Sequence, residues 1–159
     1  CYGMQMAIIE FARNKLKIKK ATSSEFDKKG THVVGLINEW IKDGITIKGT
    51  DKNLGGTMRL GSYDAKLKDN SLIKKIYGKN LIKERHRHRY EVNINYMKKF
   101  EKNGMFFSGL SPDGMLPEII ELKNHNWFIG VQFHPEFKSR PLAPHPLFSS
   151  FIKASKNHK

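Results

Sequence analysis

Two short stretches at opposite ends of the chain carry the side chains of an activated thiol nucleophile. Cys1 opens the sequence, and the run Gln132-Phe133-His134-Pro135-Glu136-Phe137 places a histidine and a carboxylate two residues apart near its end. A cysteine attacks carbonyl carbon when a neighbouring histidine takes its proton and a third group holds the imidazole in place. Cys1, His134 and Glu136 are therefore the candidate catalytic residues, as nucleophile, base and orienting carboxylate.

The residues after Cys1 predict a helix whose amino-terminal end faces the sulfur. Apolar residues at positions 4, 8 and 11 form one stripe on a helix over Met4–Phe11. The free N–H groups and the positive dipole end of such a helix stabilise a thiolate. Gly3 is the small neighbour that a sharp turn at a nucleophile requires, and the Tyr2 backbone N–H can donate to an oxyanion. A buried, unreactive cysteine is the alternative interpretation.

The segment before His134 predicts a strand that ends at a cleft. Residues 127–133 are almost continuously apolar, as in a strand buried on both faces. Pro135 cannot donate to a sheet ladder, so the strand stops at His134. Glu136 can then turn back to hold one imidazole nitrogen. Without Cys1, a histidine that merely satisfies a backbone carbonyl would be the preferred interpretation.

Short strands and helices alternate along the rest of the chain, which predicts an α/β layer structure with one buried sheet and helices against it. The ranges 32–40, 44–49, 105–109, 117–122 and 127–133 are expected strands, 54–63 is a glycine turn leading into a strand, and 85–93 is an extended segment. Helices are expected over 4–11, 70–77, 95–102 and 147–154, and 21–26 is expected to be a polar loop.

Composition limits the class of protein. The chain has 159 residues, 38% of them hydrophobic and 28% charged, which is typical of one globular domain or part of one. No apolar run approaches the roughly 20 residues that span a bilayer. One cysteine excludes an internal disulfide and fits a reducing cytosol, so a cytoplasmic location is expected. Because the chain begins with cysteine, a processed product or a fragment is also expected.

The formal net charge of +14 raises the question of nucleic acid binding. The lysines are scattered in pairs, which favours a solvated basic surface. A basic nucleic-acid-binding module that uses the Arg-His-Arg-His-Arg run at 85–89 stays open as the less favoured alternative. His86 and His88 alternate as metal ligands on a strand can, but neither a cysteine nor an acidic third ligand lies nearby, so no metal site is expected.

Taken together, these motifs resemble a known family. Cys-x-Gly-Met-Gln at the start and Gln-Phe-His-Pro-Glu-Phe near the end resemble the class I (triad-type) glutamine amidotransferases. Further motifs at 24–26, 54–61, 85–93 and 133–141 follow in order and resemble the glutaminase domain of the CTP synthase family. Another class I glutamine amidotransferase is the alternative. The N-terminal-nucleophile amidotransferases also begin with cysteine but need no His-Pro-Glu motif.

The resemblance implies a fold and a domain boundary. It implies an α/β class I amidotransferase fold with a mostly buried sheet flanked by helices. Residues 1–159 would be the C-terminal portion of the glutaminase domain, without its N-terminal strands and without the upstream glycine loop that donates a second oxyanion N–H. Because one lost oxyanion donor costs on the order of 10²–10³ in rate, the 159 residues alone are expected to be weakly active or inactive.

The resemblance also implies roles for individual residues. Cys1 would form a γ-glutamyl thioester, and Glu25 would receive the α-ammonium group of free L-glutamine. Tyr2 stands where the family usually has leucine, and residues 54–61 resemble the lid that the family links to GTP, the expected allosteric activator. The residues expected to bind glutamine are Tyr2, Gly3, Met4, Gln5, Glu25, Arg89 and Tyr90.

Partners beyond glutamine follow from the same resemblance. The released ammonia would serve the conversion of UTP to CTP in pyrimidine biosynthesis, a ligase reaction that uses ATP and Mg on a synthetase domain absent from these residues. No cofactor is expected within the 159 residues. A homotetramer is expected for the whole protein, and neither a membrane nor nucleic acid is expected as a partner.

Overall fold

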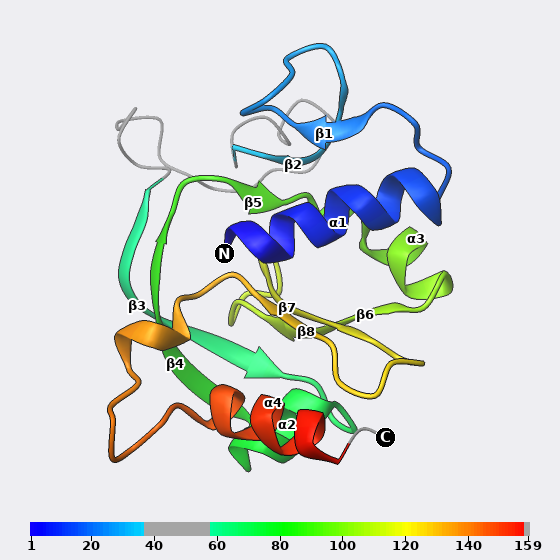
Figure 1. Ribbon diagram of the computed structural model, residues 1–159. Coiled ribbons are helices and arrows are strands. Elements are labelled where there is room, and N and C mark those ends of the chain that lie inside the picture. Colours follow the sequence, from blue (N-terminus) through cyan, green and yellow to red (C-terminus); the bar gives the residue numbers. More distant parts are fainter. Residues whose placement is uncertain (37–57, 158–159) are drawn as a thin grey trace.

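The computed structural model describes residues 1–36 and 58–157, which form two sheets around one long amino-terminal helix (Figure 1). The helix α1 spans Tyr2–Asn14 and begins directly after Cys1, its N-cap. Met4, Ile8 and Phe11 are buried on the predicted apolar stripe, and Ile9 and Ala12 widen it. The expected strand 44–49 and parts of the expected segments 32–40 and 54–61 lie outside the described residues.

A small sheet lies on one side of α1. Its order is β1-β2-β5, with β1 at Ala21–Ser23, β2 at Thr31–Gly35 and β5 at Glu91–Val92. The prediction of a polar loop over 21–26 is wrong for its first half, because Ala21–Ser23 is a buried strand parallel to β2. Small side chains fit under α1 here, and Arg13 Nε donates to the Ala21 carbonyl at 2.7 Å.

The second sheet is antiparallel, with the order β4-β3-β6-β7-β8. The expected single sheet is thus corrected to two, because β5 turns away from β4 to pair with β2. The α/β class with helices flanking the sheets is confirmed. The strands are β3 (Arg59–Leu67), β4 (Leu81–His88), β6 (Met105–Leu110), β7 (Pro117–Leu122) and β8 (Ile129–Val131).

The strand before His134 is shorter and less buried than expected. Its ladder covers only Ile129–Val131, and these residues are partly exposed because β8 is the edge strand of its sheet. Gln132 and Phe133 are fully buried beyond the ladder. The His134 backbone N–H then donates to the Arg85 carbonyl of β4 at 2.8 Å. The Gln132 backbone N–H donates to the Glu118 carbonyl of β7 at 2.9 Å, so the chain passes from β7 to β4 between Gln132 and His134.

Three further helices complete the fold. The helix α3 (Met97–Lys102) packs against β6, while α2 (Leu72–Tyr77) and α4 (Pro146–Lys156) lie side by side at the opposite end of the molecule from β1 (Figure 1). Short 3-10 turns precede α3 at Ile94–Tyr96 and follow His134 at Pro135–Phe137. Within the described ranges, no helix is long and apolar enough to cross a membrane.

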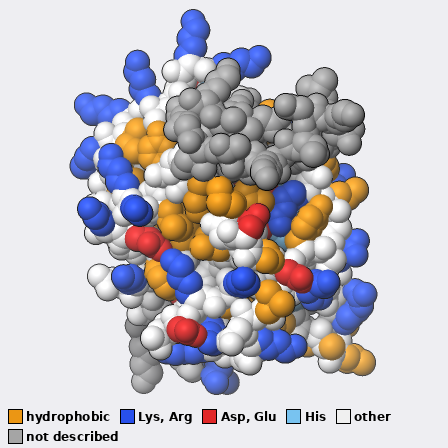
Figure 2. All heavy atoms as spheres, turned by 180° about the vertical axis from the view of Figure 1, so that it is seen from behind, with side chains coloured by type: hydrophobic (Ala, Val, Ile, Leu, Met, Phe, Trp, Pro, Cys, Tyr) orange, Lys and Arg blue, Asp and Glu red, His pale blue; other side chains and the backbone are white. Residues whose placement is uncertain are grey.

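The positive charge is dispersed over the face of the molecule drawn in Figure 2. On the face seen in Figure 2, Lys and Arg side chains are spread among polar and apolar ones rather than gathered into one stripe. In β4 the arginines at 85 and 87 point outward, whereas Glu84, His86 and His88 are buried. The basic run is thus one face of a half-buried strand.

Candidate active site

Cys1 lies against the end of β8, close to where the histidine motif begins. Its backbone nitrogen donates to the Val131 carbonyl at 2.6 Å, and the Gln132 side-chain Nε2 lies 3.7 Å from Sγ. As N-cap of α1, Cys1 also stands beside backbone N–H groups that have no intrahelical partner. The fold therefore unites the two motifs, which are about 130 residues apart in sequence.

His134 and Glu136 form a hydrogen-bonded pair. The distance from His134 Nδ1 to Glu136 Oε1 is 2.6 Å. Burial raises the pKa of Glu136, but the hydrogen bonds from His134 and from its own backbone N–H outweigh burial and hold the pKa below its ordinary value. An ionised Glu136 accepts a hydrogen bond from the Nδ1–H group of a neutral imidazole, whose lone pair is then on Nε2. Nε2 is buried and has no partner among the described residues, as a general base requires.

Other contacts restrain the imidazole ring of His134. It stacks on Phe137 with the ring centroids 4.9 Å apart and the planes inclined by 18°. In residues 1–36 and 58–157, no hydrogen bond joins the ring to Cys1 Sγ. Catalytic hydrogen bonds are often long without substrate, so the lack of this contact does not exclude His134 as a base for Cys1.

A cavity of about 450 Å³ opens beside Cys1 and brings together most of the residues expected at the glutamine site. Tyr2 and Gln5 come from the first turn of α1, Glu25 follows β1, and Arg89 and Tyr90 connect β4 to β5. Its lining residues are Cys1, Tyr2, Gln5, Glu25, Met58, Arg87, His88, Arg89 and Tyr90. A thiol, a carboxylate and a guanidinium thus line one cavity that is open to solvent.

Four of the predicted site residues do not line this cavity. Met4 is 2% exposed and packs in the core under α1. Gly3 is exposed, and an added Cβ would meet nothing within 4 Å in the described part of the chain, so the packing seen here gives no reason for glycine. His134 and Glu136 are not among the lining residues either. Burial lowers the pKa of the Cys1 α-amino group, and Glu136 is near enough to oppose this larger effect.

Sequence reasoning missed three lining residues and one contact to the sulfur. Met58, Arg87 and His88 line the cavity, and Gln132 reaches Sγ. The alternation of arginine and histidine over 85–89 is the signal that could have placed His88 on the inner face of a strand. Gln132 gave no such signal, because only tertiary contacts turn it towards Cys1.

A buried ionic cluster lies behind the cavity. Arg59 Nη1 is 2.6 Å from Glu118 Oε1 and 3.4 Å from Glu91 Oε1, and both glutamates are fully buried. Burial raises the pKa of Glu91 to about 8 despite the opposing charge of Arg59. Burial, and then the charge of Arg59, lower the pKa of His86 to about 2 and that of His88 to about 3. Both histidines are therefore neutral at physiological pH.

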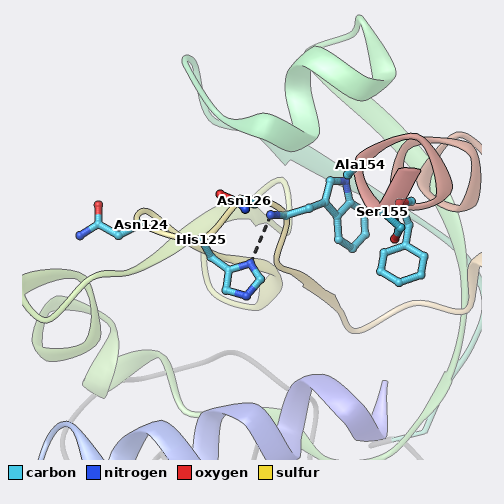
Figure 3. A pocket seen from close by; sticks show the side chains of 7 residues that line it. Asn124, His125, Asn126, Ala154 and Ser155 are labelled. Atoms are coloured by element: carbon cyan, nitrogen blue, oxygen red, sulfur yellow. Dashed lines mark hydrogen bonds between the residues drawn. The ribbon is translucent and has the colours of Figure 1, made fainter. Parts of the chain in front are cut away.

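A second cavity, of about 360 Å³, lies between the β7–β8 connection and α4. Figure 3 shows His125 and Asn126 on the connection and Ala154 and Ser155 on α4. His125 Nδ1 accepts the Trp127 backbone N–H at 3.2 Å. Neither a thiol nor a carboxylate belongs to its lining, so it offers no counterpart to the chemistry at Cys1.

Comparisons with known proteins agree on a family. The model of the glutamine amidotransferase class-I family matches residues 1–154. The chain is 83% identical over all 159 residues to a CTP synthase of Pelagibacter ubique (strain HTCC1062) and 60% identical over 156 residues to one of Sphingopyxis alaskensis. It covers 30% and 29% of those two proteins, and thus less than a third of the curated relatives' length.

A solved structure has the same fold. The glutaminase domain of Trypanosoma brucei CTPS, with bound acivicin, matches with a TM-score of 0.82 at 36% sequence identity. The match covers 99% of this chain and 58% of that one. The described residues therefore correspond to part of a glutaminase domain.

Proposed function

The chain belongs to the class-I glutamine amidotransferases, and on that premise we propose that it hydrolyses the side-chain amide of L-glutamine with Cys1, His134 and Glu136. The observation that carries the proposal is the cavity beside Cys1, which Glu25 and Arg89 also line. These opposite charges match the α-ammonium and α-carboxylate groups of a free amino acid. With the two charged groups of the amino acid held in this way, its side-chain amide would lie at the Cys1 thiol.

The proposed chemistry has two steps that share one thioester. The Cys1 thiolate attacks the amide carbon of glutamine and forms a C–S bond, while the Tyr2 N–H at the start of α1 donates to the oxyanion. His134, which carries the thiol proton on Nε2, gives it to the amide nitrogen, and the C–N bond breaks to release ammonia. His134 then takes a proton from water, hydroxide attacks the thioester, and glutamate leaves as the C–S bond breaks.

Glu136 keeps His134 in the tautomer that these two reaction steps require. Its 2.6 Å contact with Nδ1 leaves Nε2 to exchange protons in both steps. The second oxyanion donor of the family comes from an upstream glycine loop that has no counterpart in the described part of the chain. We therefore expect slow turnover by these 159 residues, and labelling of Cys1 is the more sensitive measurement.

At the level of the whole protein, we propose that the ammonia is used to convert UTP to CTP. The CTP synthase relatives support this role. ATP, Mg and UTP would act on a synthetase domain outside these residues, and no step above passes through them. GTP activation through the 54–61 segment is proposed with it, because Met58 of that segment lines the Cys1 cavity. A homotetramer and a cytoplasmic location remain part of the same proposal.

The test is covalent labelling of Cys1 by an electrophile shaped like glutamine, such as its chloroketone analogue. Mass spectrometry should place the adduct on Cys1, the sole cysteine. Free L-glutamine should slow labelling, whereas D-glutamine and L-asparagine should protect weakly. The substitution His134→Ala should slow labelling because the thiol loses its base.

A matched pair of variants separates recognition from reactivity. Glu25→Gln should weaken protection by L-glutamine because the α-ammonium loses its carboxylate, while iodoacetamide should alkylate Cys1 as fast as before. Asp27→Asn, two residues further along the same exposed loop, should retain protection. Labelling that L-glutamine does not slow would refute the proposed function.

A further inference from the structure

Gln132 holds a buried amide nitrogen against the sulfur of Cys1. The residue is fully buried, and its Nε2 lies 3.2 Å from the Tyr90 carbonyl and 3.7 Å from Cys1 Sγ. An amide nitrogen has two hydrogens, so it can donate to both. Because the Tyr90 carbonyl only accepts, it fixes which end of the amide faces the sulfur.

The Tyr90 carbonyl oxygen lies within hydrogen-bonding distance of three side-chain nitrogens. Besides the bond from Gln132, it accepts hydrogen bonds from Gln5 Nε2 at 2.9 Å and from His88 Nδ1 at 3.2 Å. A carbonyl oxygen has two lone pairs, so three donors on it form a crowded junction in which each constrains the others. The position of the Gln132 amide thus depends on the donors that share its acceptor.

His88 links this junction to the buried ionic cluster. Since its Nδ1 donates to Tyr90, its Nε2 must accept, and His86 Nδ1 lies 2.8 Å from it. His86 Nδ1 is also 3.8 Å from the carboxylate of Glu118, the partner of Arg59. The neutral state of both rings leaves each with one donor and one acceptor, which fixes the direction of the hydrogen bonds.

We propose that Gln132 is a further catalytic residue of glutamine hydrolysis, whose amide N–H stabilises the Cys1 thiolate, and that His88 is a positioning residue that holds this amide through the Tyr90 carbonyl. The inference rests on the proposed function. The backbone N–H groups at the start of α1 are the first donors near the sulfur, and the Gln132 amide is the second. Its own Oε1 is buried without a partner in residues 1–36 and 58–157, so hydrogen bonding at both ends of the side chain does not explain its presence.

The test measures the rate of Cys1 alkylation by iodoacetamide against pH. Iodoacetamide reacts with the thiolate, and the single cysteine makes the rate specific to Cys1. The midpoint of this pH–rate curve is the pH at which half of the thiol is ionised. In Gln132→Met, which keeps the side-chain length but loses the donor, this midpoint should move up by about one pH unit, and the alkylation rate below the midpoint should fall roughly tenfold. The limiting rate at high pH should be retained, which a change in access would not allow.

His88 is tested by replacement and rescue. His88→Phe should move the midpoint in the same direction by a smaller amount, because Gln132 keeps its donor but loses its fixed position. His88→Asn places an amide nitrogen near the site of Nδ1 and should restore most of the midpoint. His145→Asn is the matched control, since His145 is equally buried but caps α4 away from Cys1, and it should leave the midpoint unchanged.

Circular dichroism and protection by L-glutamine establish that each variant is folded. If Gln132→Met does not fold, Gln132→Asn keeps a polar group but is too short to reach Sγ, and it should give the same shift. A folded, glutamine-protected Gln132 variant with an unmoved midpoint overturns the role of Gln132 and leaves the proposed function intact. Equal midpoints in His88→Phe and the parent chain overturn the role of His88. Wild-type labelling without protection by L-glutamine refutes the proposed function instead.

Discussion

The substitution Glu136→Gln tests how much the orienting carboxylate contributes when it is open to solvent. A hydrogen bond to a charged group contributes roughly 1.5–3 kcal/mol when buried. The Glu136 side chain is 55% exposed, however, and solvent-exposed charge pairs contribute about 1 kcal/mol or less. With about 1.4 kcal/mol per factor of ten in rate, we expect labelling of Cys1 by the glutamine analogue to slow about fivefold at pH 7.

A small effect is also expected because other contacts hold His134. The ring stacks on Phe137, and the backbone N–H is bound to the Arg85 carbonyl. A buried triad carboxylate, in contrast, contributes a factor of about 10⁴, largely through the tautomer it selects. The glutamine side chain at position 136 can still accept from Nδ1 through its oxygen, so the tautomer is retained.

The assay is the second-order rate constant of inactivation, kinact/KI, with the adduct located by mass spectrometry. Glu10→Gln, an exposed carboxylate on α1 that accepts from Asn14, is the matched control and should label at the parent rate. A loss of 10³ or more in Glu136→Gln would refute the exposure argument. A rate within a factor of two of the parent would instead show that the negative charge of Glu136 does not contribute to the rate, since the glutamine oxygen can still accept from Nδ1.

Three further predictions concern stability. Between pH 4.5 and 8 the folded protein keeps the Glu91 proton that the unfolded chain releases, so Glu91 lowers the stability of the fold as pH rises. His86 and His88 stay neutral in the folded protein but gain a proton on unfolding below pH 6.5, so they lower its stability as pH falls. Burial lowers the pKa of the Cys1 α-amino group from 8.0 to about 6, which makes the unfolded chain bind the extra proton between pH 6 and 8 and opposes the Glu91 effect. The Glu91 contribution is therefore read as a difference: the free energy of unfolding in urea of the parent, relative to Glu91→Gln, should decrease from about pH 6.5 to 8, and a difference that does not change with pH would contradict the burial argument. Gly109→Ala should lower the free energy of unfolding by about 1–3 kcal/mol, because its Cβ would lie 2.8 Å from Ile119 Cγ1. Gly3→Ala should instead raise it by about 0.5–1 kcal/mol through α1 and retain Cys1 labelling. Equal urea midpoints for the two variants would refute this contrast. Phe100→Ala should cost about 3–5 kcal/mol, because the buried ring packs on Phe11 and Phe107, and a loss below 1 kcal/mol would place Phe100 outside the core.

The sequence alone determined the local features of the site. The apolar stripe after Cys1 predicted α1, because helical periodicity depends only on neighbouring residues. Pro135 set a limit for the strand before His134, since proline lacks the N–H that a ladder needs, but the ladder ends earlier, at Val131. The motif order identified the family, which the class-I model over residues 1–154 confirms.

The tertiary structure decided which side chains meet. Ala21–Ser23 is polar enough for a loop, yet it becomes a strand because α1 and β2 bury it. Met4 follows the family motif but faces the core, since helical geometry turns it away from the cavity that Gln5 lines. The contact of Gln132 with Cys1 joins residues 131 positions apart. Such pairings depend on how strands and helices pack, and no local pattern encodes them.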